Sequence, residues 1–84
     1  MYFHVTGTLP DRKWLAPFVE DEIRVSEELK AQGTTLMVVR RVDRPGVFLI
    51  MQAESQEAVQ EALGRLPFVA EGLMTLDIVE VTRL

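Results

Sequence analysis

Two apolar segments on either side of a tight-turn sequence constrain the fold of this chain most strongly. Leu36–Val39 and Val47–Met51 are apolar at consecutive positions, and Asp43–Gly46 between them places Pro and Gly where a tight turn needs them. The pattern predicts a hairpin of two strands, Thr35–Val42 and Val47–Ala53, with apolar side chains on both faces. A sheet that is covered on one face alone shows alternating apolar and polar residues. Both faces of this hairpin therefore need a covering layer.

The rest of the chain supplies two more strands and two helices. Period-two alternation predicts a first strand over Tyr2–Leu9 and a last strand over Met74–Thr82. Helices are expected over about residues 15–32 and over Ser55–Gly64, and Leu66–Phe68 is expected to form a turn. The order βαββαβ in 84 residues predicts one ferredoxin-like α+β domain over the whole chain, with a four-stranded antiparallel sheet and both helices on one face.

The helices cover only one face of such a sheet. The other apolar face would exceed the few hundred Å² that a soluble monomer usually exposes, so a second copy is expected to pack its sheet there, most simply through a two-fold axis. Burial of some 1,000 Å² of apolar area at roughly 25 cal/mol per Å² contributes about 25 kcal/mol before the costs of association. The sequence therefore predicts a homodimer of the dimeric α/β barrel type.

Composition excludes several classes of function. The chain has no cysteine and only one histidine, His4, which excludes disulfides, thiolate nucleophiles and multi-histidine metal sites, and no cofactor is expected. A net charge of −4 and the lack of repeated aromatic residues argue against nucleic-acid binding. No apolar run approaches the roughly 20 residues that cross a bilayer, and the N-terminus lacks a signal-peptide pattern. We expect a cytoplasmic protein without a membrane or nucleic-acid partner.

A carboxylate on the apolar side of the first predicted helix is the strongest candidate for chemistry. With about 100° of rotation per residue, Glu22 and Ser26 fall inside the apolar arc of that helix. The arc is formed by Leu15, Phe18, Val19, Val25 and Leu29. Burial there would raise the pKa of Glu22 toward the range of a general base. The alternative is a rotated or short helix in which Glu22 reaches solvent or pairs with Arg24.

His4 and Arg40 are the other two candidates for catalysis. His4 lies in the strand that this topology makes central, on the face expected to meet the second copy, where a lone histidine is more often a hydrogen-bonded interface residue than a proton carrier. Arg40, if it points into the layer that holds Glu22, can pair with that carboxylate or bind the carboxylate of an anionic substrate. Arg41 and Arg44 are expected to be solvated near the hairpin tip.

Short motifs spread along nearly the whole chain carry a resemblance to known proteins. They are Tyr2–Val5, Glu22, Ser26–Gly33, Arg40, Ala53–Ser55, Leu66–Pro67 and Asp77–Val81. In these motifs the chain resembles the muconolactone delta-isomerases. The resemblance implies a ferredoxin-like subunit, dimers by sheet packing that are often assembled into a decamer, and a cofactor-free proton shift in an unsaturated lactone. It also matches Glu22 to a carboxylate of the family's first helix and Arg40 to an arginine of its second strand.

One segment departs from the family pattern. Where the isomerases carry a basic stretch with histidine and tryptophan, this chain has Thr34–Val39, from which we expect an apolar pocket and a different substrate. The segment Leu66–Leu73 is more similar to the related YCII-like proteins, but their His-Asp pair is not recognisable here.

These observations leave three hypotheses for the function. The first is an isomerase-like, cofactor-free enzyme for a small unsaturated lactone or carbonyl compound, in which Glu22 moves a proton and His4 or Arg40 stabilises the oxyanion. The expected substrate-binding residues are Ser26, Trp14 and Phe18. The second is a non-catalytic oligomeric module that binds a small hydrophobic ligand. The third is a cofactor-independent monooxygenase in which Trp14 and His4 line the pocket.

Overall fold

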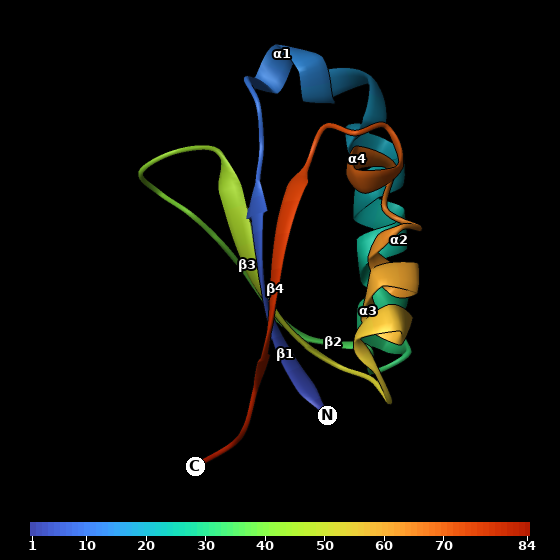
Figure 1. Cartoon of the computed structure of the whole chain (residues 1–84). Helices are drawn as coiled ribbons and strands as arrows, with labels where there is room; N and C mark the ends of the chain where they lie inside the picture. The colour runs from blue at the N-terminus through green and yellow to red at the C-terminus, as the bar shows by residue number, and fades with distance from the viewer.

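A computed structural model describes residues 1–84, and its elements follow the predicted order. They are β1 (Tyr2–Thr8), α1 (Arg12–Leu15), the short 3₁₀ helix η1 (Ala16–Phe18), α2 (Val19–Ala31), β2 (Thr35–Arg40), β3 (Gly46–Gln52), α3 (Gln56–Leu63), α4 (Pro67–Ala70) and β4 (Thr75–Val81). The strands form one antiparallel sheet in the order β2-β3-β1-β4, and α2, α3 and α4 lie on one side of it (Figure 1). The predicted ferredoxin-like α+β fold is therefore confirmed.

The first helical region is longer and more broken than the single helix expected over residues 15–32. It begins at α1, where a carboxylate oxygen of Asp11 accepts a hydrogen bond from the backbone N–H of Lys13 at 3.1 Å. Pro17 lacks a backbone N–H, and η1 separates α1 from α2 at this point. The end of α2 is as expected, because Gly33 adopts the left-handed φ of +77° that often follows a helix. None of the helices has the length and apolar content that crossing a membrane requires.

Two smaller expectations also need correction. The strand expected up to Val42 ends at Arg40, and the segment expected to be a turn at Leu66–Phe68 begins the short helix α4. The N-terminus of α3 is as predicted, since the Ser55 hydroxyl accepts a hydrogen bond from the N–H of Ala58 at 3.1 Å.

A β-bulge in β2 changes which side chains face the helices. Thr35 lies opposite Met51, but Met37 lies opposite Ile50, so Leu36 is an extra residue in β2. The regular alternation of side chains between the two faces of the strand fails at this point. Leu36 is 48% exposed and lines a shallow hollow on the side of the sheet away from the helices.

We call that side of the sheet the open face. Its large apolar residues are Leu36, Met37, Val39, Phe48, Ile50, Val79 and Val81. Met37 is 57% exposed and Val79 is 50% exposed. The second apolar face predicted from the hairpin sequence is therefore present, and nothing within the chain covers it.

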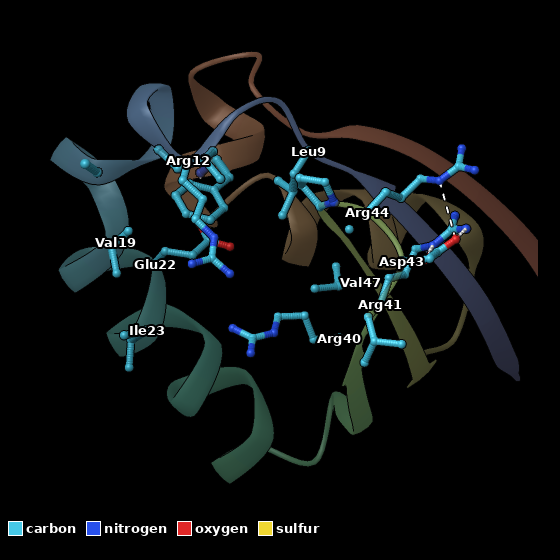
Figure 2. Close-up of a pocket in the computed structure, with 16 residues that line it drawn as sticks. Leu9, Arg12, Val19, Glu22, Ile23, Arg40, Arg41, Asp43, Arg44 and Val47 are labelled. Atoms are coloured by element: carbon cyan, nitrogen blue, oxygen red, sulfur yellow. Dashed lines mark hydrogen bonds and ion pairs between the residues drawn. The ribbon is translucent and has the colours of Figure 1, made fainter.

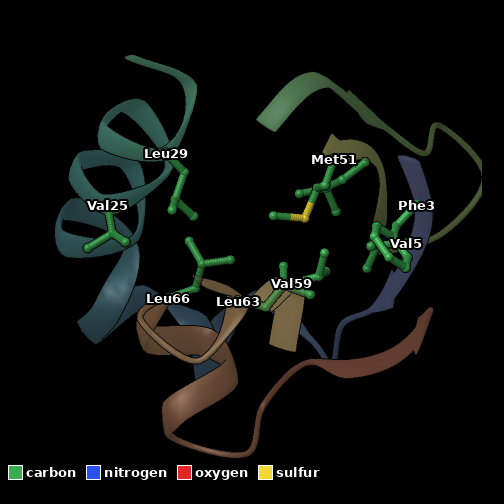
Figure 3. Close-up of a cluster of buried hydrophobic side chains, with 9 residues drawn as sticks. Phe3, Val5, Val25, Leu29, Met51, Val59, Leu63 and Leu66 are labelled. Carbon is green, nitrogen blue, oxygen red and sulfur yellow. The ribbon is translucent and has the colours of Figure 1, made fainter. Parts of the chain in front are cut away.

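The hydrophobic core lies between the sheet and the helices α2 and α3 (Figure 3). It consists of Phe3, Val5, Val25, Leu29, Leu49, Met51, Val59, Leu63 and Leu66. A smaller cluster of Leu15, Phe68 and Met74 joins α1 to α4 and the start of β4. Together the two clusters fix α1, α2 and α4 around one end of the sheet, and the candidate site lies there.

Candidate functional site

A cavity of about 740 Å³ lies between α1, the first half of α2 and the β2–β3 hairpin (Figure 2). Its apolar wall includes Leu9, Leu15, Val19, Ile23, Val47 and Phe68, and its charged residues are Arg12, Glu22, Arg40, Arg41, Asp43 and Arg44. A smaller cavity of about 250 Å³ extends along α2 toward the core. Glu22 belongs to the wall of both cavities.

Glu22 is half-buried on the sheet-facing side of α2 and is held at one oxygen. Its Oε1 accepts a hydrogen bond of 2.8 Å from the backbone N–H of Phe68. Phe68 lies in the first turn of α4, where backbone N–H groups have no partner within their own helix. Burial raises the pKa of Glu22 above its ordinary value of 4.5, although the hydrogen bond from Phe68 acts in the opposite direction. A carboxyl group with a raised pKa in a cavity wall suits proton transfer.

Two arginines reach this cavity without a carboxylate partner. Arg40 extends from β2 into the space in front of α2, and Arg12 extends from α1 on the side of Glu22 (Figure 2). No carboxylate oxygen lies within 4.0 Å of a side-chain nitrogen of either arginine. Both guanidinium groups are therefore free to bind an anion.

The hairpin supplies two more cations at the rim of the cavity, Arg41 and Arg44. Both were expected to be solvated, but Arg41 is paired with Asp43 and is only partly exposed. Arg41 donates two hydrogen bonds to Asp43, from Nε at 2.9 Å and from Nη2 at 2.7 Å. The Arg41 guanidinium holds the pKa of Asp43 down at about 2 and also lies 5.4 Å from the centre of the Phe48 ring. Arg44 is 3.5 Å from the same carboxylate and is largely exposed, as predicted.

The three predicted substrate-binding residues lie in different places. Ser26 lines the smaller cavity one helical turn from Glu22. Phe18 packs behind the wall against the Leu15 cluster and lines neither cavity. Trp14 is 59% exposed and lines no cavity, and its ring lies 5.4 Å from the Lys13 ammonium.

His4 lies on the open face, because the neighbouring residues Phe3 and Val5 are buried against the helices. It sits across from Ile50 and Val79 in the adjacent strands. The sheet therefore separates His4 from the cavity that holds Glu22, and the two do not share a cavity within one chain.

The segment Thr34–Val39, from which an apolar pocket was expected, contributes little to the cavities on the helix side of the sheet. Leu36, Met37 and Val39 point to the open face, and only Val38 lines the smaller cavity. The cavity instead carries four arginines.

Arg12 and Phe68 were missed as site residues. Arg12 was missed because the helix was expected to start later, although Asp11 is a typical N-cap residue that could have indicated the earlier start. No sequence pattern predicts the hydrogen bond between Phe68 and Glu22, because its donor is the backbone N–H of a residue that is distant in the sequence. No three histidine or acidic side chains gather closely enough to bind a metal ion.

Comparison with known proteins gives consistent matches. A family model described as muconolactone delta-isomerase matches residues 1–83. The solved structure of a muconolactone isomerase is 25% identical, covers 100% of this chain and 91% of its own, and has a TM-score of 0.82. A search of curated proteins finds no match.

A second solved structure shows the same fold. It is the 5-chloro-2-hydroxyhydroquinone dehydrochlorinase from Burkholderia phenoliruptrix AC1100, in complex with 2,5-dihydroxybenzoquinone. It is 21% identical, covers 98% of this chain and 94% of its own, and has a TM-score of 0.82. Because the family model spans nearly all of the sequence, the chain belongs to the muconolactone delta-isomerase family.

Proposed function

We propose that this protein is a cofactor-free isomerase that moves a proton within a small unsaturated lactone or related carbonyl compound. One observation carries the proposal. The half-buried carboxyl group of Glu22, with its raised pKa, lies in the wall of a cavity that also contains the unpaired guanidinium of Arg40. Family membership supports the same reaction class.

In the proposed mechanism, Glu22 acts first as base and then as acid. Its Oε1 is held by Phe68, so Oε2 takes a proton from a carbon activated by the carbonyl group, and the bonding electrons move to the carbonyl oxygen. While the dienolate is bound, the carboxyl proton of the half-buried Glu22 exchanges with solvent. Oε2 then gives a proton to the dienolate at another carbon, which shifts the double bond without net oxidation or reduction. General acid–base catalysis of this kind contributes typically about 10²–10⁴-fold to the rate.

Arg40 is proposed to stabilise the negative charge that develops on the carbonyl oxygen. The backbone of Arg40 is held in place because β2 pairs with β3, with Arg40 opposite Val47. Its side chain points into the cavity (Figure 2). A fixed cation at the site of developing charge lowers the barrier more than one that must be ordered during the reaction. His4, on the other face, has no part in this step within one chain.

The two alternatives are less well supported. A non-catalytic module for a hydrophobic ligand predicts a cavity without a perturbed titratable group, whereas this cavity contains Glu22 and four arginines. The monooxygenase hypothesis needs Trp14 and His4 in one pocket, but neither residue lines the cavity.

We also propose that two copies pack together through their open faces. Leu36, Met37, Val39 and Val79 of that face are about half exposed in one chain, and a second sheet would bury them. A higher assembly such as a decamer remains a prediction from the family resemblance.

The test is isomerisation of muconolactone, or of a smaller unsaturated lactone, followed by NMR. We expect Glu22→Gln to lower kcat by about 10²–10⁴-fold. The matched control is Glu20→Gln, which removes an exposed carboxylate of the same helix that lines no cavity and should keep normal activity. A wild-type protein without activity on any of these lactones, or equal rates for the two variants, would show that the proposal is wrong.

A further inference from the structure

The cavity has a charge of opposite sign to the chain as a whole. The chain carries a formal charge of −4, yet the lining of the large cavity includes four arginines and only two carboxylates. A half-enclosed cavity with excess positive charge attracts anions, and its low-dielectric walls strengthen that attraction. The ligand of this site is therefore expected to carry a negative charge.

The four arginines are not equivalent. Arg41 is bound at two nitrogens by Asp43, and Arg44 is close to the same carboxylate. Arg12 and Arg40 have no carboxylate within 4.0 Å. These two cations are therefore the ones free to meet a ligand.

Arg12 and Arg40 also differ in their positions. Arg40 lies at the end of the edge strand β2, where it pairs with Val47 of β3, and is assigned above to the developing oxyanion. Arg12 is the first residue of the four-residue helix α1, which lines the cavity on the side of Glu22, and it is exposed, as Arg40 is. A side chain on a short helix suits binding of a charge that the substrate already carries, because that contact needs less precise placement than stabilisation of a transition state.

We infer that Arg12 is a specificity-determining residue that binds a permanent carboxylate of the substrate. The inference deepens the proposed function, on which it rests, by naming the residue that selects acids over neutral compounds. In this arrangement the reacting part of the substrate lies between Glu22 and Arg40, over the apolar wall formed by Leu9 and Val47, and its carboxylate extends toward α1.

The test compares an acid with its neutral methyl ester in four proteins. Muconolactone and its methyl ester serve as the kinetic pair, and sorbate and methyl sorbate serve as a pair for equilibrium binding. The proteins are the wild type, Arg12→Gln, Arg12→Lys and the control Arg24→Gln, which removes an exposed arginine of α2 that lines no cavity. Wild type and control are expected to prefer the acid by about tenfold.

Arg12→Gln is expected to lose this preference through a higher KM for the acid, with kcat and the KM for the ester unchanged. Arg12→Lys should keep part of the preference, because the positive charge remains. The inference is overturned if Arg12→Gln retains the full preference, or if kcat falls while KM is unchanged.

The binding pair separates this inference from the proposed function. If the wild type turns over no lactone but binds sorbate more tightly than methyl sorbate in an Arg12-dependent way, the proposed reaction is wrong and the role of Arg12 stands. If turnover depends on Glu22 but the acid preference does not depend on Arg12, the reaction stands and the inference fails.

Discussion

The carboxylate of Glu22 and the backbone N–H of Phe68 are joined by a hydrogen bond of 2.8 Å, although the residues are 46 positions apart. The bond connects α2 to α4 and fixes Oε1 at the cavity wall. Oε2 has no hydrogen-bond partner within the chain and remains available for proton transfer. The position of the proposed base therefore depends on packing between the two halves of the sequence.

The raised pKa of Glu22 predicts a specific dependence of stability on pH. The folded state holds the proton of Glu22 more tightly than the unfolded state, whose pKa is near 4.5. The contribution of Glu22 to the free energy of unfolding therefore falls as pH rises from the ordinary pKa through the raised one, and it stays constant above that range. Glu22→Gln is neutral throughout and lacks this loss.

Denaturant unfolding of wild type and Glu22→Gln between about pH 4 and pH 8 tests this dependence. The variant should gain stability relative to wild type as pH rises and then keep a constant difference. Glu20→Gln, which changes an exposed carboxylate, should show no such trend. A difference between Glu22→Gln and wild type that does not change with pH would mean that burial does not perturb this group.

A charge on the open face should separate the proposed dimer. Met37→Glu places a carboxylate among apolar residues that a second copy would bury, and desolvation of an unpaired charge costs several kcal/mol. Sedimentation at micromolar concentration should show a dimer for wild type and monomers for the variant. Ala31→Glu, at an exposed position of α2, is the control and should remain dimeric. A folded wild-type monomer at this concentration would contradict the proposed packing.

His4 should affect assembly rather than catalysis. Its side chain lies on the open face beside Phe48, with ring centres 5.7 Å apart, and not in the cavity of Glu22. We expect His4→Gln to leave kcat within about twofold of wild type and to weaken the dimer. Steady-state rates at protein concentrations well above the dimer dissociation constant separate the two effects. A loss of kcat as large as that of Glu22→Gln would instead place His4 in the chemistry, through contact with the second copy.

Local patterns were sufficient to predict the fold and the position of Glu22. Helical rotation accumulates little error over a few residues, so Glu22 and Ser26 were correctly placed toward the sheet from their spacing to Val25 and Leu29. The Pro45–Gly46 turn and the Gly33 stop also depend on local backbone preferences, and they occur where expected.

Local sequence patterns could not predict the β-bulge in β2 or the contacts between residues that are far apart in the sequence. The bulge at Leu36 puts this residue on the open face, whereas simple alternation would place it with Val38 and Arg40 on the side of the cavity. The hydrogen-bond partner of Glu22 is a backbone N–H of α4, so the identity of the Phe68 side chain does not predict this contact. Arg12 reaches the cavity only because α1 folds back over the end of the sheet (Figure 1).

Deuterium incorporation into an unsaturated lactone in heavy water, followed by NMR, tests the role of Glu22 most directly, since it reports removal of a proton from carbon even when no product accumulates. Wild type should catalyse exchange at the carbon activated by the carbonyl group, and Glu22→Gln should be slower by about 10²–10⁴-fold while remaining folded. Equal exchange rates in the two proteins, or no exchange above background with wild type, would show that Glu22 does not move a proton in this cavity.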